Sequence, residues 1–121
     1  MSMPLIQTRQ PDQKAALTAR FFQVLADPTR VRITALLLDG EKNVGELVEA
    51  LGIQQGRVSA HLACLKWCGF IGMRREGKFV YYSVTDDRVH EIMTLARGLL
   101  ADHAGAVASC LRLDQFHYRT E

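Results

Sequence analysis

The stretch that decides the fold runs from Val44 to Ile71 and reads VGELVEALGIQQGRVSAHLACLKWCGFI. Apolar residues recur at helical spacing on both sides of the short segment GIQQG, which predicts helices over about Val44–Leu51 and Gln55–Trp67. Gly52 ends the first helix, and the pair Cys68-Gly69 ends the second. Two helices joined by a short turn that contains glycine form a helix-turn-helix.

The segments on either side add a wing to this motif. Before it, two helices are predicted, the second with Asp27 as N-cap and Pro28 at its first position. After it, FIGMRREGKFVYYSV changes to the spacing of strands, with Glu76-Gly77 at the tip of a β-hairpin. The sequence therefore predicts a mainly α fold with a β-hairpin wing, a winged helix-turn-helix. Its single domain has five parts: N-terminal helices 11–39, helix-turn-helix 43–68, wing 70–84, C-terminal helix 86–108 and tail 109–121.

Composition excludes several classes of protein. The chain has 121 residues, enough for one domain. Its longest apolar run is well short of the ~20 residues that cross a bilayer, and its first residues do not form a secretory signal. Three cysteines are an odd number, which argues against a closed disulfide framework and for a reducing cytoplasm. No paired nucleophile and base and no glycine-rich phosphate loop is present, so we expect no enzyme and no organic cofactor.

Charge is distributed unevenly along a chain whose net charge is only +2. Residues 39–51 are mainly acidic, whereas residues 54–85 are mainly basic. A basic surface suits DNA phosphates, although charge alone fits a solvated face equally well. The second helix of the motif lacks the usual Ser or Thr cap, which leaves its register open by one or two positions. The candidate DNA contacts are Gln54, Gln55, Arg57, Ser59 and His61 on this helix, and Arg74, Arg75 and Lys78 in the wing.

Three segments in this order, LADPTRVRITALLLDG, the opening stretch and REGKFVYYSV, resemble the ArsR/SmtB family of metal-responsive repressors. The resemblance covers roughly residues 20–105. It implies a homodimer that pairs through the first and last helices and so makes 86–108 a dimerisation helix. It further implies that the apo-protein binds a palindromic double-stranded DNA operator and leaves it when an inducer binds.

Cys64 and Cys68 lie four residues apart, so on a helix they share one face with Cβ atoms roughly 5–6 Å apart. A single free cysteine is often a small buried apolar residue, but one metal ion could bind both of these sulfurs. The segment LACLKWC resembles the cadmium- and lead-sensing branch of the family, in which a third cysteine comes from the C-terminal region of the partner. The resemblance thus implies a trigonal site of Cys64, Cys68 and Cys110 of the partner subunit. Trp67 is expected to pack in the core or at an interface.

Sulfur ligands select the class of metal ion. Three thiolates favour cadmium, lead or mercury as the inducer, whereas zinc would need a fourth ligand such as His103 or His117. Without Cys110, the remaining pair could hold Hg(II) linearly. Metal on the base-reading helix is expected to weaken operator binding. Two alternatives stay open on the same fold: a repressor that senses thiol oxidation, and a metal-independent regulator with structural cysteines.

Overall fold

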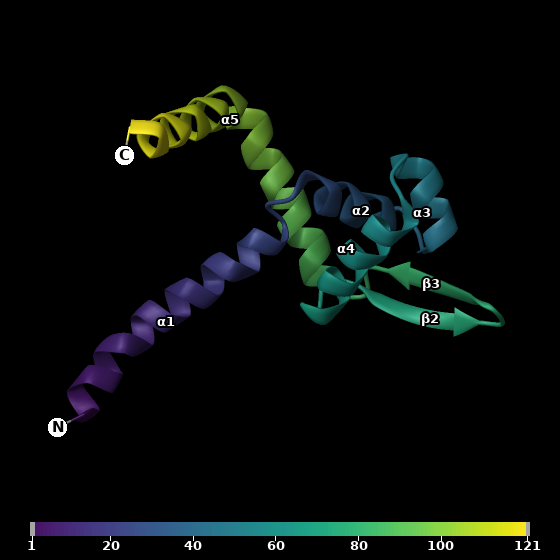
Figure 1. Cartoon of the computed structure of the whole chain (residues 1–121), viewed down its shortest axis with the longest axis horizontal. Helices are drawn as coiled ribbons and strands as arrows, with labels where there is room; N and C mark the ends of the chain where they lie inside the picture. Colours follow the sequence, from purple (N-terminus) through teal and green to yellow (C-terminus); the bar gives the residue numbers. More distant parts are fainter. Residues whose placement is uncertain (1, 121) are drawn as a thin grey trace. The chain divides into compact units, whose positions relative to one another are not determined.

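The computed structural model describes the backbone of residues 2–120 and the side chains of residues 12–110. It divides into two units, Met1–Asp86 and Asp87–Glu121, which are described separately. Figure 1 shows the order of the elements, which is α1 (Ser2–Val24), α2 (Pro28–Leu38), β1 (Lys42–Asn43), α3 (Val44–Leu51), α4 (Gln55–Trp67), β2 (Gly72–Glu76), β3 (Phe79–Ser83) and α5 (Asp87–Thr120).

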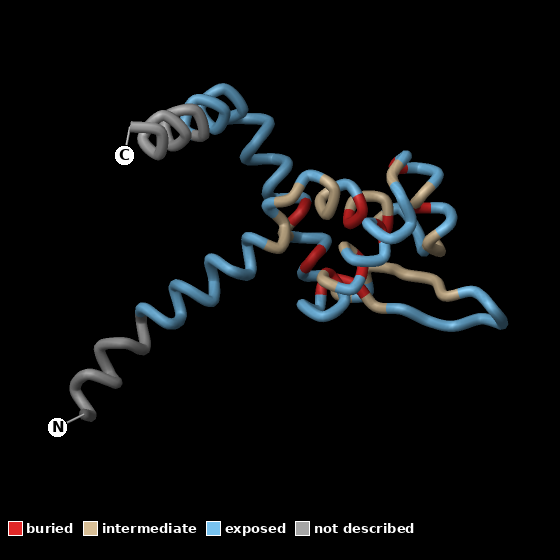
Figure 2. The backbone as a smooth tube through the Cα atoms, viewed as in Figure 1, coloured by how far each residue is buried: buried red, intermediate tan, exposed pale blue. Residues whose placement is uncertain are grey.

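The core of the first unit lies among α2, α3 and α4. Within the first unit, the residues drawn as buried in Figure 2 gather on these helices and on the segment that follows α4. Each helix contributes apolar side chains that are almost fully buried, and Phe70 and Ile71 close the core after α4. The helical members are Ile33, Leu37, Leu47, Leu51, Val58, Leu62 and Leu65. The predicted helix-turn-helix of α3 and α4 is thus present and carries most of the core.

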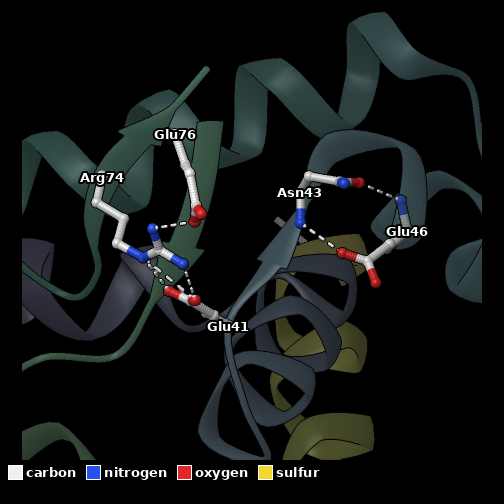
Figure 3. Close-up of polar contacts among 5 residues, drawn as sticks. All are labelled: Glu41, Asn43, Glu46, Arg74 and Glu76. Atoms are coloured by element: carbon white, nitrogen blue, oxygen red, sulfur yellow. Dashed lines mark hydrogen bonds and ion pairs between the residues drawn. The ribbon is translucent and has the colours of Figure 1, made fainter. Parts of the chain in front are cut away.

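Short-range hydrogen bonds fix where α2 and α3 begin. The Asp27 carboxylate accepts hydrogen bonds from the backbone N–H groups of Thr29, at 2.8 Å, and Arg30, at 3.2 Å. Asn43 and Glu46 form a capping box at the start of α3: the Asn43 side chain accepts from the Glu46 N–H, and the Glu46 carboxylate accepts from the Asn43 N–H (Figure 3). Gly52 ends α3 in the left-handed region, with φ of 70°, where glycine is favoured.

The wing contains three strands rather than the two that the sequence predicts. The antiparallel sheet has the order β1-β3-β2, and β2 pairs with β3 from Gly72–Ser83 to Glu76–Phe79. A two-residue loop, Gly77-Lys78, joins them, and Gly77 has φ of 61°. The additional strand β1 pairs Lys42 with Tyr82 and Asn43 with Tyr81. Its two residues are too few to produce a strand pattern in the sequence.

The second unit is the helix α5. It includes one residue with non-helical backbone angles, His103, at φ −131° and ψ 22°. The helix continues to Thr120, so residues 109–120, which the sequence predicts to be a tail, are helical in the structure. In the part of the chain that the structure describes, no helix is long and apolar enough to cross a membrane.

Candidate functional site

The two thiols of α4 lie together at the C-terminal end of the helix. Cys64 is half-buried in the last turns, and Cys68 is the C-cap residue. Although Cys68 is exposed as a residue, partial burial of its thiol raises the pKa, and the neighbouring thiol of Cys64, to which it is hydrogen-bonded, raises it further. The positive charge of Arg30 acts in the opposite direction. The raised pKa keeps the Cys68 thiol protonated at neutral pH, so a metal ion that binds this sulfur must displace its proton.

The thiol pair lines an open hollow of about 400 Å³. The other walls of this hollow come from the end of α1 and from one residue of α2. They are Leu17, Arg20, Phe21, Gln23, Val24 and Arg30. Sequence spacing does not connect these residues with the cysteines, because they lie more than thirty residues earlier in the chain.

Two sets of contacts hold the end of α1 beside the thiols. The Phe21 ring packs on the buried ring of Phe70, with centroids 5.0 Å apart. Arg30 donates from Nε to the Val24 carbonyl oxygen at 2.5 Å and from Nη2 to the Gln23 carbonyl oxygen at 3.2 Å. The first bond gives a partner to a carbonyl group at the end of the helix, and the second adds a donor to the Gln23 carbonyl oxygen, which also accepts from the Ala26 N–H at 3.1 Å. The wall of the hollow is therefore fixed to the core.

The third predicted ligand, Cys110, belongs to a different element from the thiol pair. Cys110 is an exposed residue of α5 in the second unit. Among the residues whose side chains are described, no three His, Cys, Asp or Glu residues come together in a way that could hold a metal ion. His103 is exposed, and the side chain of His117 lies outside the described residues. A three-sulfur site that uses Cys110 of the partner subunit stays a prediction.

The N-terminal half of α4 presents most of the residues predicted to contact bases. Gln54 is the N-cap and makes no side-chain capping bond, so the helix begins at Gln55. Gln55, Arg57 and Ser59 are exposed, as a base-reading face requires. His61 is half-buried instead, and its charge is among the smaller influences that lower the pKa of Asp27, after the hydrogen bond from the Arg30 N–H. His61 therefore lies toward the start of α2.

The three wing cations differ in their surroundings. Figure 3 shows the Arg74 guanidinium between the carboxylates of Glu41 and Glu76. Its Nε donates to Glu41 Oε2 at 2.9 Å, its Nη2 makes a second, short contact with Glu41, and its Nη1 donates to Glu76 Oε2 at 2.6 Å. These hydrogen bonds raise the pKa of Arg74 and lower that of Glu41. Arg74 also lies 4.9 Å from the centre of the Tyr81 ring.

Arg75 and Lys78 are exposed on the wing. Among the described side chains, the ion pairs of the wing involve Arg74 and neither of these two residues. Lys78 Nζ lies 5.4 Å from the centre of the Phe79 ring, a contact that leaves the ammonium group accessible. Arg75 and Lys78 are thus available to phosphates, whereas the charge of Arg74 is already balanced by carboxylates.

Trp67 departs from its expected environment. It is 92% exposed, so the expectation that it packs in the core is wrong for the single chain. The core-facing positions of α4 are Val58, Leu62 and Leu65, and helical spacing places residue 67 on a different face. A role for Trp67 at an interface stays a prediction.

Comparisons with known proteins agree with this fold. Residues 27–72 match the family described as "Bacterial regulatory protein, arsR family". A "Probable mercury resistance operon repressor" of Streptomyces lividans is 51% identical over 96 residues, which are 79% of this chain and 77% of the relative. The "HTH-type transcriptional regulator CmtR" of Mycobacterium bovis is 40% identical over 78 residues, 64% of this chain and 66% of the relative.

A solved structure gives the same result for the architecture. The solution structure of a homodimeric winged helix-turn-helix DNA-binding domain from Mycobacterium bovis, a possible ArsR-family transcriptional regulator, has a TM-score of 0.68 and 35% identity. The similarity covers 76% of this chain and 88% of that one. The predicted winged helix-turn-helix is confirmed, and so is the expectation of a regulator rather than an enzyme. The chain belongs to the ArsR family of bacterial regulatory proteins, which bind DNA through this motif.

Proposed function

We propose that this protein is a repressor that binds a palindromic operator as a homodimer and leaves it when a soft heavy-metal ion binds its cysteines. One observation carries the proposal: the thiols of Cys64 and Cys68 are in contact at one end of α4, whose other end exposes Gln55 and Arg57. The sensing groups and the base-reading groups thus share a single helix of thirteen residues.

Mercury is the first candidate for the inducer. Thiolates alone select soft ions, a class that includes Hg(II), Cd(II) and Pb(II). The relative that is 51% identical carries a name that refers to mercury resistance, which favours Hg(II) within this class. Cys64 and Cys68 supply two sulfurs, and Cys110 of the partner subunit supplies the third in the proposed trigonal site.

The short distance between the two ends of α4 explains how metal could weaken DNA binding. Arg57 and Cys64 are seven residues apart, a rise of about 10 Å along the helix. A dimer reads half-sites about 34–36 Å apart, so a small change in the tilt of each α4 misplaces both sets of base contacts. A tenfold to ten-thousandfold loss of operator affinity corresponds to about 1.4–5.5 kcal/mol of coupling between metal and DNA.

The alternative of a thiol-oxidation sensor has weaker support. Reactive cysteines have a lowered pKa that provides thiolate at neutral pH. The pKa of Cys68 is raised by burial and by its neighbour Cys64, so its thiolate fraction is small.

A titration of the reduced protein with HgCl₂ tests the proposal, with thiolate-to-metal absorption and operator binding measured on the same samples. The native protein is expected to take up one ion per subunit and to release DNA at that point. Replacing both Cys64 and Cys68 with serine should abolish both signals, and Cys110→Ser should reduce the absorption by about a third if three equivalent sulfurs bind. Metal-independent release, or native regulation in the variant that lacks Cys64 and Cys68, would contradict the proposal.

A further inference from the structure

The two faces of the wing carry different charges, because successive side chains of a strand point to opposite faces. Arg74 and Glu76 share one face of β2 with Tyr81, the β3 residue that pairs with Arg74. Glu41, which precedes β1, reaches this face through its ion pair with Arg74 (Figure 3). We call Glu41, Arg74 and Glu76 the wing cluster. One guanidinium and two carboxylates give it a net charge of −1, whereas Arg75 gives the opposite face of β2 a positive charge.

The contacts of the wing cluster hold the Arg74 guanidinium away from other anions. Its Nε donates to Glu41 Oε2 at 2.9 Å, its Nη2 contacts the second oxygen of the same carboxylate, and its Nη1 donates to Glu76 Oε2 at 2.6 Å. Such a two-point pair of arginine and carboxylate has a defined geometry. The Arg74 and Glu76 side chains are nevertheless 51% and 67% exposed, so DNA that approaches this face meets the cluster directly.

We propose that the wing cluster determines the specificity of DNA binding, because its two carboxylates keep this face of the wing from binding phosphates. Glu41 and Glu76 are then specificity residues, although neither reads a base. The inference concerns the metal-free protein and is independent of the inducer that acts at the thiols. It rests on the DNA binding that the family shares and on the contact of the wing with DNA.

The repulsion acts mainly on complexes with the wrong sequence. Phosphate contacts supply affinity for any DNA, whereas base contacts add affinity for the operator alone. On the operator, the base contacts of α4 fix the orientation of the protein, and the wing meets phosphates through the face that carries Arg75. On other sequences no base contact fixes the orientation, so the wing cluster also faces the DNA. Its net negative charge disfavours these complexes, which raises the ratio of operator to non-operator affinity.

Substitutions change the charge of the wing cluster in steps of one. Arg74→Gln lowers it from −1 to −2, Glu41→Gln raises it to 0, and Glu41→Gln combined with Glu76→Gln raises it to +1 and frees Arg74. A freed cation that contacts one phosphate adds about 0.9 to the slope of log K against log salt concentration. At about 0.15 M salt this slope corresponds to about fivefold higher affinity for each subunit, relative to about 1 M salt.

Fluorescence anisotropy of two labelled duplexes, measured on the metal-free, full-length protein, tests the inference. One duplex is the sequence that the native protein selects from a random pool, and the other is a shuffled version with the same length and base composition. The variant with both Glu41→Gln and Glu76→Gln should bind the shuffled duplex at least about fivefold more tightly than the native protein does, and should gain less on the selected duplex. Arg74→Gln should bind the shuffled duplex more weakly.

Glu49→Gln is the matched control for net charge. Glu49 is exposed on α3, and the ion pairs of the described side chains do not include it. This variant should keep the native ratio of the two affinities. A fall in the ratio as large as that in the cluster variant would overturn the inference, because the effect would then come from net charge alone.

Equal gains on the two duplexes in the cluster variant would also overturn the inference. If the combined variant fails to fold, Glu76→Gln decides the question, because it removes one exposed carboxylate and leaves the two-point pair of Arg74 with Glu41 in place. A lower ratio of selected to shuffled affinity in Glu76→Gln supports the inference, and an unchanged ratio overturns it.

Discussion

Replacing Arg75 with alanine is expected to reduce the salt dependence of operator binding. Arg75 is exposed on β2, and the described ion pairs of the wing do not include it. Its neighbour Arg74 is held by Glu41 and Glu76. Although the two arginines are adjacent in the sequence, only Arg75 offers a guanidinium that is free to neutralise a DNA phosphate and release a counterion.

The size of the effect follows from the number of wings. Each phosphate contact adds about 0.9 to the slope of log K against log salt concentration, so one contact per wing in the proposed homodimer contributes about 1.8. Over a fourfold increase in salt, from about 50 to 200 mM, this slope amounts to a factor of about 12 in affinity. Arg75→Ala should therefore bind much more weakly than the native protein at low salt, with a deficit that shrinks about 12-fold at the higher concentration.

Fluorescence anisotropy of a labelled operator across this salt range measures the slope directly. Arg75→Lys is the matched control and should keep the native slope, because it keeps the charge. Glu41→Gln is the informative second variant: it removes the bidentate carboxylate partner of Arg74 and should make the slope steeper. The reasoning is refuted if Arg75→Ala leaves the slope unchanged, or if Arg74→Gln lowers it more than Arg75→Ala does.

Three further predictions concern stability. Asn43→Ala breaks the capping box with Glu46 and should lower the free energy of unfolding by about 1 kcal/mol, whereas Asn43→Asp keeps an acceptor and should preserve it; urea unfolding distinguishes them. The hydrogen bond from the Arg30 N–H, with that from Thr29, lowers the pKa of Asp27 below 3.8 in the folded state. The charged Asp27 carboxylate therefore stabilises the folded state fully above pH 3.8, and this stabilisation is lost as the pH falls through the folded-state pKa. Thermal melts from pH 7 to pH 2 should show a smaller decline in melting temperature for Asp27→Asn than for the native protein, and an equal decline would contradict the assignment. Leu62→Ala removes a side chain that is 1% exposed and should cost about 2–5 kcal/mol in urea unfolding; a cost near zero would show that Leu62 is not in the core.

The parts of the fold that depend on neighbouring residues could be predicted from the sequence. Asp27 and Pro28 start α2, and Gly52 ends α3, because capping bonds and left-handed backbone angles act over a few residues. The pairing of Cys64 with Cys68 is also local, since helical geometry alone places residues four apart on one face. These predictions needed no knowledge of which segments pack together.

The parts that depend on distant segments could not be predicted. The charge of Arg74 predicts a DNA contact, but its partner Glu41 lies 33 residues earlier, and only the folded sheet brings the two together. The strand β1 exists because β3 pairs with it, which two residues of sequence cannot reveal. Helical spacing predicts that Trp67 faces away from the core, as it does, whereas the general preference of tryptophan for packed sites predicts the opposite.

Asn43 has two structural roles, and together they connect the wing to the reading motif. It is the last residue of β1, paired with Tyr81 of β3, and it is the N-cap of α3. Strand pairing and helix initiation therefore share one residue, so the wing and α3 should open as one cooperative unit in amide hydrogen exchange. A phosphate contact that orders the wing would then slow exchange in the first turn of α3, which makes the amide of Glu46 a sensitive probe of wing docking on DNA.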